Sequence, residues 1–86
     1  MSSPGRKKEL SEIEALVGAK MLINGDTDPV ISSSELADWA GVSTDTARSR
    51  LNDLHDKGHA NKKQIGARAL VFWITPEGYE RLNETD

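Results

Sequence analysis

The 86-residue sequence contains no cysteine, which excludes a disulfide framework, thiolate catalysis and a thiolate metal site. A chain without cysteine fits a reducing compartment such as the cytoplasm. No apolar run approaches the ~18 residues that a membrane-spanning helix needs. The first ten residues, MSSPGRKKEL, carry basic side chains with no apolar segment behind them, so they do not resemble a secretory signal. We therefore expect a cytoplasmic protein with no membrane segment.

The sequence also lacks the residue arrangements on which catalysis and metal binding depend. It contains no Ser/His/Asp arrangement, no phosphate-binding glycine loop and no paired carboxylates of the kind that line a cleft. His55 and His59 are four residues apart, but Gly58 interrupts the helix between them, and no third ligand is placed nearby. We therefore predict no enzymatic activity, no bound metal and no cofactor.

Positive charge is scarce overall, yet it is concentrated in the middle of the chain. The formal net charge is −3. Residues 42–74 contain six basic and three acidic side chains, whereas acidic residues outnumber basic ones both before and after this segment. Binding to a polyanion depends on the local field more than on the total charge. This distribution therefore permits nucleic-acid binding and argues against strong, indiscriminate binding.

Length and local composition predict a short tail followed by one small domain. Residues 1–6 are small, polar or basic, and we expect them to be disordered. Residues 7–86 are enough for a single domain. Within it, apolar residues at helical spacing predict an amphipathic helix over residues 7–23, which the turn-forming residues 24–29 end. Residues 30–31 then form a short extended piece.

Two short helices follow, and polar residues predict where each begins. Ser32 and Glu35 have the spacing of a capping box that opens a helix over residues 34–40. Ser43 is placed to cap the next helix, over residues 43–57, which the following glycine ends. One stripe of that second helix is apolar and predicted to be buried: Ala47, Leu51 and Leu54.

The pattern then changes from helical to extended. Residues 59–65 and 69–74 predict two strands, joined by a short turn at 66–68. Thr75 and Pro76 are typical of the start of a last short helix. Two side chains of that helix are expected to point inward: Tyr79 and Leu82.

Two short helices joined by a tight glycine-containing turn, followed by a hairpin, indicate a helix-turn-helix with a wing. The segment ELADWAGVSTDTARSRLNDLHDKG, the hairpin and the final ITPEGYERL resemble the winged-helix DNA-binding regulators, especially small MarR-like proteins of archaea and bacteria. The resemblance spans about residues 31–82. It implies an α+β winged helix-turn-helix with a three-helix core, a two-stranded β-hairpin wing and a short C-terminal helix.

The resemblance also implies a function. The expected protein is a homodimeric transcriptional regulator that binds specific sequences of double-stranded DNA. It would place the helix at residues 43–57 in the major groove and use the hairpin at residues 59–74 as the wing. The predicted DNA-binding residues lie on these two elements: Ser43, Thr44, Asp45, Thr46, Arg48, Ser49, Asn52, Lys62, Lys63 and Arg68.

Arg48 and Asn52 are the predicted base-reading pair, because residues four apart on a helix share one face. Arginine matches the two acceptors of guanine, and asparagine matches the edge of adenine. Thr44, Thr46 and Ser49 are better suited to phosphate or mixed contacts.

The same helix face has a second interpretation, as an ordinary solvated surface. Asp45 either accepts a hydrogen bond from a cytosine amine or simply holds Arg48 three residues on. Asp45 with Arg48, and Asp53 with Lys57, have the spacings of helical ion pairs. Arg50 lies closer to the buried stripe, which equally favours a packing or salt-bridge role.

Three further features also have two interpretations. The basic residues of the hairpin either contact phosphate or the minor groove, or protect an exposed strand edge from aggregation. Trp39 and Trp73 either cover each other or the first helix, or belong to a dimer surface. The alternative to DNA binding for the whole protein is a winged-helix adaptor whose acidic flanks bind a basic protein partner.

Overall fold

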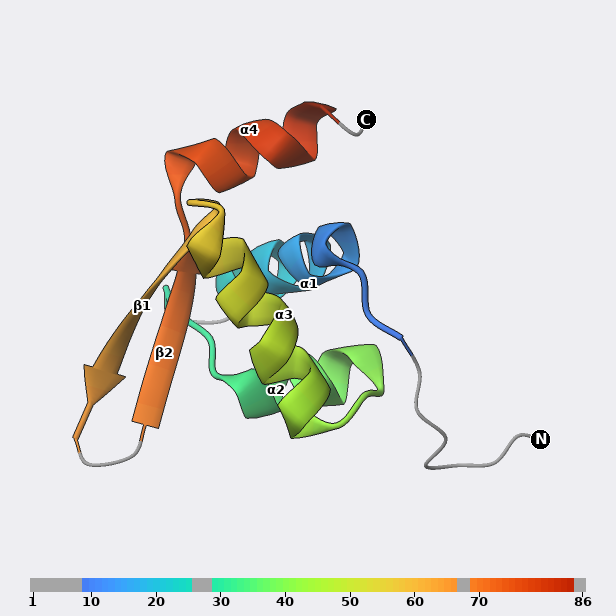
Figure 1. Ribbon diagram of the computed structural model, residues 1–86, viewed down its shortest axis with the longest axis vertical. Helices are drawn as coiled ribbons and strands as arrows, with labels where there is room; N and C mark the ends of the chain where they lie inside the picture. Colours follow the sequence, from blue (N-terminus) through green and yellow to red (C-terminus); the bar gives the residue numbers. More distant parts are fainter. Residues whose placement is uncertain (1–8, 26–28, 67–68, 85–86) are drawn as a thin grey trace.

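The computed structural model describes residues 9–25, 29–66 and 69–84 (Figure 1). Its elements in chain order are α1 (Glu12–Gly25), α2 (Ser33–Ala40), α3 (Thr44–Asp56), β1 (Ala60–Ile65), β2 (Ala69–Ile74) and α4 (Pro76–Glu84). Four helices and a hairpin in this order are the α+β arrangement that the sequence predicts. The predicted tail at residues 1–6 lies outside the described residues, as does Arg68.

The start of α1 differs from the prediction, which placed it near residue 7. Residues 9–11 are not helical, and the helix begins at Glu12. Ser11 and Glu14 explain this start: the Glu14 amide donates to Ser11 Oγ at 3.1 Å, and the Ser11 amide donates to Glu14 Oε1 at 2.9 Å. This capping box satisfies two amides that have no partner inside the helix. The apolar spacing predicted too early a start because it includes Leu10, which is buried but not helical.

Local signals set the limits of α2 and α3 as predicted. Ser32 caps α2 with a complete capping box, since its Oγ accepts from the Glu35 amide and Glu35 Oε1 accepts from the Ser32 amide. Gly41 ends α2 with φ at 72°, and Gly58 follows α3 with φ at 81°. Both angles lie in the left-handed region, where a residue with a Cβ is strained. The tight turn between the helices therefore depends on Gly41.

The buried side chains form a core where the first three helices meet the hairpin. Its largest fully buried members are Phe72, Leu16, Ile31, Leu36, Leu51 and Leu54. Full burial of one such apolar side chain contributes about 1.5–3 kcal/mol. The predicted inward stripe of α3 is confirmed, because all three of its residues are buried: Ala47, Leu51 and Leu54.

The hairpin is tied to this core through β2. β1 and β2 pair antiparallel, from Ala60 opposite Ile74 to Ile65 opposite Ala69. On the other edge of β2, the Ile31 amide donates to the Phe72 carbonyl at 2.9 Å, and the Phe72 amide donates back at 2.8 Å. This bridge confirms the extended piece predicted at residues 30–31. It anchors the inner half of the hairpin to the chain segment just before α2.

Helix α4 begins as predicted, but one of its two side chains expected to point inward is partly exposed. Thr75 Oγ1 accepts from the Gly78 amide at 3.1 Å and donates to the Gly58 carbonyl at 2.6 Å. Leu82 is buried, as expected, whereas Tyr79 is 37% exposed, so its predicted inward position is wrong. The residues that face inward are Gly78 and Leu82, which are four apart. The absence of a side chain at Gly78 lets α4 approach the hairpin backbone.

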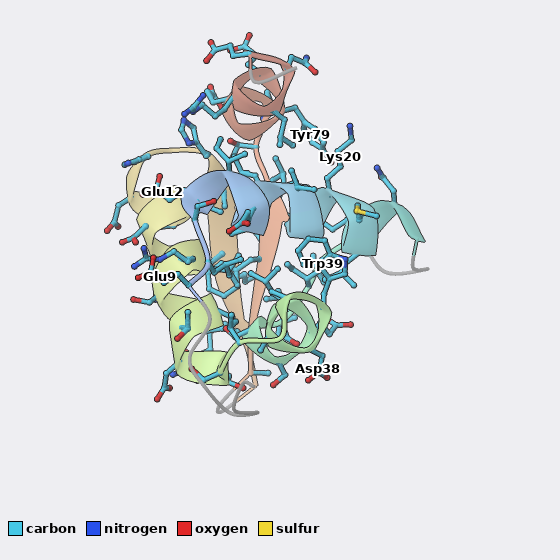
Figure 2. The ribbon with its side chains drawn as sticks, turned by 90° about the vertical axis from the view of Figure 1, so that its right-hand side faces the viewer. Glu9, Glu12, Lys20, Asp38, Trp39 and Tyr79 are labelled. Atoms are coloured by element: carbon cyan, nitrogen blue, oxygen red, sulfur yellow. The ribbon has the colours of Figure 1, made fainter. Side chains whose placement is uncertain are left out.

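Trp39 lies on the side of α2 that faces α1 (Figure 2). A Cβ placed on Gly18 of α1 would come within 2.6 Å of Trp39 Cε3, so the indole packs directly on that glycine. This position matches the interpretation in which the tryptophan covers the first helix. Despite this contact, Trp39 is 41% exposed. Trp73 is half-buried on β2.

Replacing Gly78 with alanine is expected to destabilise the protein, although alanine is the better helix former by about 1 kcal/mol. A Cβ at this position would overlap the carbonyl oxygen of His59 and lie 2.6 Å from Ile74 Cγ2. Because a backbone carbonyl cannot move aside as a side-chain end can, the free energy of unfolding should fall by about 2 kcal/mol in urea denaturation.

Gly25→Ala is the matched control, since a Cβ there meets nothing within 4 Å among the described residues. An unchanged or higher urea midpoint for Gly78→Ala would contradict the close packing of α4 on the hairpin.

Candidate nucleic-acid interface

Burial of one side of α3 turns its opposite side toward solvent. The side chains of Asp45, Arg48 and Ser49 are exposed on that side. Thr44, Thr46 and Asn52 are half-buried beside them. The helix therefore presents the polar face that the sequence predicts, with hydroxyls near its N-terminus and longer polar groups further along.

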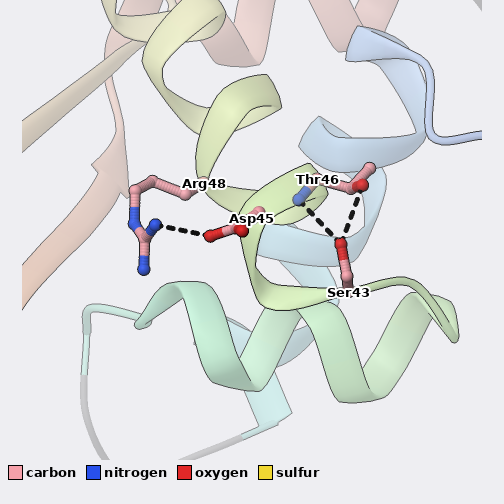
Figure 3. A network of polar contacts seen from close by, with 4 residues as sticks. All are labelled: Ser43, Asp45, Thr46 and Arg48. Carbon is pink, nitrogen blue, oxygen red and sulfur yellow. Dashed lines mark hydrogen bonds and ion pairs between the residues drawn. The ribbon is translucent and has the colours of Figure 1, made fainter.

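The N-terminus of α3 is held by a pair of hydroxyl groups (Figure 3). Ser43 Oγ accepts from the Thr46 amide at 3.1 Å and donates to Thr46 Oγ1 at 2.9 Å. Ser43 is thus committed to capping the helix. The Thr46 hydroxyl accepts from Ser43, which leaves its own hydrogen available to an outside acceptor.

Asp45 and Arg48 form an ion pair on the exposed surface, with Oδ1 and Nη1 2.9 Å apart (Figure 3). Of the two roles open to Asp45, the structure shows the one in which it holds Arg48. The side chains are 90% and 48% exposed, and pairs exposed to this degree contribute only about 0–1 kcal/mol. Of the five N–H donors of Arg48, the pair uses one. The remaining donors are free to meet another acceptor.

The second half of α3 is engaged with the protein itself. Arg50 Nη2 pairs with Asp53 Oδ2 at 2.9 Å, which is the salt-bridge role left open for this arginine. The helical spacing suggested an ion pair between Lys57 and Asp53, but Lys57 pairs with a different residue. Its Nζ instead donates to both carboxylate oxygens of Glu12 in α1, at 2.9 and 3.0 Å. The first of these pairs lies within α3, and the second links its C-terminal end to α1.

The two lysines of the wing lie on opposite faces of the hairpin. Residues directly opposite in an antiparallel pair share one face, so Lys62 lies on the face of Phe72 and Lys63 on the face of Val71. Because Phe72 is buried in the core, Lys62 points to the α3 side. There its Nζ donates to Oδ1 of Asn52 at 2.8 Å, in a partly buried position. The structure thus brings Asn52 and Lys62 together and separates Lys63 from them.

A hollow of about 240 Å³ beside the start of α3 adds residues that the sequence did not single out. It is lined by the serines at the start of α2, by the start of α3 and by the outer half of β2: Ser32, Ser33, Ser34, Thr44, Arg48, Ala69, Leu70 and Val71. The run of three serines was interpreted only as a helix cap. Its position next to Arg48 follows from the packing of α2 against α3, which the sequence pattern does not reveal.

The surface formed by the start of α2, the N-terminal half of α3 and the hairpin is therefore rich in hydrogen-bond donors. Such a surface can bind phosphate oxygens and base-edge acceptors. Among the described residues, no three side chains of the metal-ligating types come together. Within the same part of the chain, no helix is long and apolar enough to cross a membrane.

No protein-family model matches the chain, and no curated protein matches it in sequence. The fold is similar to that of a candidate DNA-binding protein from Ralstonia eutropha JMP134, with a TM-score of 0.72 and 18% identity over 86% of this chain and 91% of that chain. A mutant of Lactococcus lactis ZitR in apo form has a TM-score of 0.62 and 12% identity over 86% of this chain and 52% of ZitR. A second ZitR mutant has a TM-score of 0.63 and 11% identity over 99% of this chain and 54% of ZitR.

This chain thus spans about half the length of ZitR. Structural similarity at sequence identities this low establishes the fold alone, so the function has to be argued from the residues. The fold is the predicted α+β winged helix-turn-helix, with β1 and β2 as the wing and α4 as the short C-terminal helix.

The cap of α3 is open to a direct test with serine-to-alanine variants. Ser43→Ala removes the oxygen that accepts from the Thr46 amide, which should lower the free energy of unfolding by about 1 kcal/mol. Ser49→Ala makes the same chemical change on an exposed residue in the middle of α3 and should leave stability unchanged or slightly raised, because alanine favours helix. Chemical denaturation measures both. Equal effects of the two substitutions would contradict the capping role.

Proposed function

We propose that this protein is a transcriptional regulator that binds double-stranded DNA, with α3 in the major groove and the hairpin as a wing. The observation that carries the proposal is the polar face of α3. The first turns of that face present Arg48, which uses one donor on Asp45, and further along the helix Asn52 contacts Lys62 of the wing.

The geometry of α3 supports base reading by its first turns. An α-helix fits the major groove, which is about 12 Å wide, and in helix-turn-helix docking the N-terminal residues reach the base edges. Arg48 lies one turn into α3, and the exposed ion pair with Asp45 is weak enough to exchange for guanine acceptors. Thr44, Thr46 and Ser49 supply hydroxyl groups nearby for phosphate. Ser43 acts chiefly through the helix cap.

Charge and similarity support the same reading. The positive excess of residues 42–74 falls on the hairpin, because α3 itself carries two arginines against three aspartates. Lys63 lies on the face of the wing opposite Lys62 and is proposed to contact phosphate. Arg68, which lies outside the described residues, is proposed to do the same. The similar fold of a candidate DNA-binding protein adds weight. A closer relationship to small MarR-like regulators of archaea and bacteria remains part of the proposal.

We further propose that two copies pair through α1 and α4. Val17, Met21 and Tyr79 are large apolar side chains left exposed on these helices. A cavity of about 500 Å³ lies between the helices, and among the residues that the structure describes Lys20 is the only charged one of its lining. Exposed apolar surface with little charge is typical of protein interfaces. A two-fold axis at this surface would present two copies of α3 to half-sites ~34–36 Å apart.

The adaptor alternative uses the same fold without DNA. It would rest on the acidic side chains of α1 and α4 rather than on α3. The two functions differ in what salt and the loss of the Arg48 side chain do to binding. Only DNA binding should weaken with both.

Arg48→Ala is expected to weaken binding to a selected duplex by roughly tenfold or more and to relax preference at one base pair, because a bidentate contact to guanine discriminates by about 1–3 kcal/mol. Arg81→Ala is the matched control. Arg81 is similarly exposed and also pairs with an acidic residue three positions on, Glu84, but it lies on α4. Fluorescence anisotropy at two salt concentrations measures both. Absence of binding to any duplex at low salt, or equal losses for the two variants, would contradict the proposal.

Met21→Glu should convert the dimer into monomers, because Met21 is 57% exposed beside the cavity and a buried carboxylate in an apolar interface is costly. Ile65→Glu is the control, since Ile65 is also an exposed apolar residue, but at the end of β1. Analytical ultracentrifugation should find a dimer for the wild type and for Ile65→Glu. A monomeric wild type, or a Met21→Glu variant that stays dimeric, would contradict pairing through α1 and α4.

A further inference from the structure

The contact between Asn52 and Lys62 joins the recognition helix to the wing and involves two of the predicted DNA-binding residues. Lys62 Nζ lies 2.8 Å from Asn52 Oδ1, and the contact is partly buried. Only one of the two wing lysines can make this contact, because Lys62 is on the α3 side of the hairpin whereas Lys63 is on the other side. Asn52 therefore does not face DNA as an independent amide.

The chemistry of the pair fixes the orientation of the amide. A lysine ammonium has three donors and no acceptor, so the atom that it touches must be the carboxamide oxygen. The NH₂ group of Asn52 is consequently the end turned away from Lys62. Apart from the second lone pair of Oδ1, the two side chains together offer donors: the amide hydrogens and the ammonium hydrogens that Asn52 does not use.

We propose that Lys62 is a positioning residue that makes Asn52 read guanine instead of adenine. This inference rests on the proposed function. Guanine presents two acceptors in the major groove, N7 and O6, and no donor, which matches the donors of this pair. Adenine presents N7 and a donating N6 amino group, and its usual asparagine contact needs the amide oxygen and the NH₂ group side by side.

The second lone pair of Oδ1 does not restore adenine recognition. The N6 amino group would have to approach an oxygen that already lies against a positive charge 2.8 Å away. Its own hydrogens carry partial positive charge, so the ammonium repels them and attracts the O6 oxygen of guanine instead. The base preference expected of Asn52 alone is thus reversed by a residue of the wing.

This role differs from a phosphate contact, which is the usual expectation for a lysine in a wing. A phosphate contact strengthens binding to all sequences alike and adds about one unit to the salt dependence. A positioning role instead changes which base is preferred at one position. The two roles therefore leave different signatures in the same experiment.

The test is selection from a random duplex pool with the wild-type protein and with Asn52→Ala. The position that loses its preference in Asn52→Ala is the one that Asn52 reads, and it should be guanine in the wild type. Adenine at that position would overturn the inference without any need for a Lys62 variant.

Lys62→Met then removes the ammonium and keeps a long side chain on β1. The ratio of adenine to guanine at that position should rise by roughly tenfold, and Lys62→Arg, which still donates to Oδ1, should retain guanine. Lys63→Met is the matched control on the opposite face of the hairpin and should lower affinity with no change in base preference.

A uniform loss of affinity in Lys62→Met with unchanged preferences would overturn the positioning role. If the wild type selects no sequence at all, the failure lies with the proposed function rather than with this inference, so the two outcomes are distinguishable.

Discussion

The arrangement of the proposed DNA-binding surface follows from the burial of one stripe of α3. Ala47, Leu51 and Leu54 are fully covered by the core, so α3 cannot rotate about its axis without exposing them. With that side fixed, the polar residues between them are forced outward. The position of Arg48 and Asn52 is therefore determined by the apolar residues of the same helix.

The ion pairs at the two ends of α3 have different partners. The C-terminal half is fastened by the pair between Lys57 and Glu12, which links α3 to α1. At the N-terminal half the contacts are local and exposed, such as the pair between Asp45 and Arg48. Exposed pairs exchange partners at little cost. The helix is thus linked to α1 at its C-terminal end, whereas the polar contacts of its first turns are made within α3.

Most of the fold could be predicted because its signals are local. Capping and glycine positions, such as Ser32 with Glu35 and the turn at Gly41, act within four residues and can be recognised in the sequence. The same logic would have found the true start of α1, since Ser11 and Glu14 have capping-box spacing. The partial exposure of Tyr79 could not be found in this way. It depends on Gly78, which packs against the backbone of His59, just before β1.

The candidate site shows the same division between local and distant contacts. The polar face of α3 follows from helical periodicity, and the pair between Asp45 and Arg48 follows from spacing. The contact of Asn52 with Lys62 joins two elements, and its existence depends on which face of the hairpin meets α3. A shift of one residue in strand register would exchange Lys62 for Lys63. The sequence places both lysines in the wing and cannot distinguish their roles.

We propose that the polar face of α3 and the wing meet duplex DNA. Titration of the ¹⁵N-labelled protein with a short duplex at low salt, followed by amide chemical shifts, tests it residue by residue. The largest changes are expected between residues 43 and 52 and in the hairpin, with α1 and α4 little affected. Changes confined to α1 and α4, or no changes at all, would contradict it.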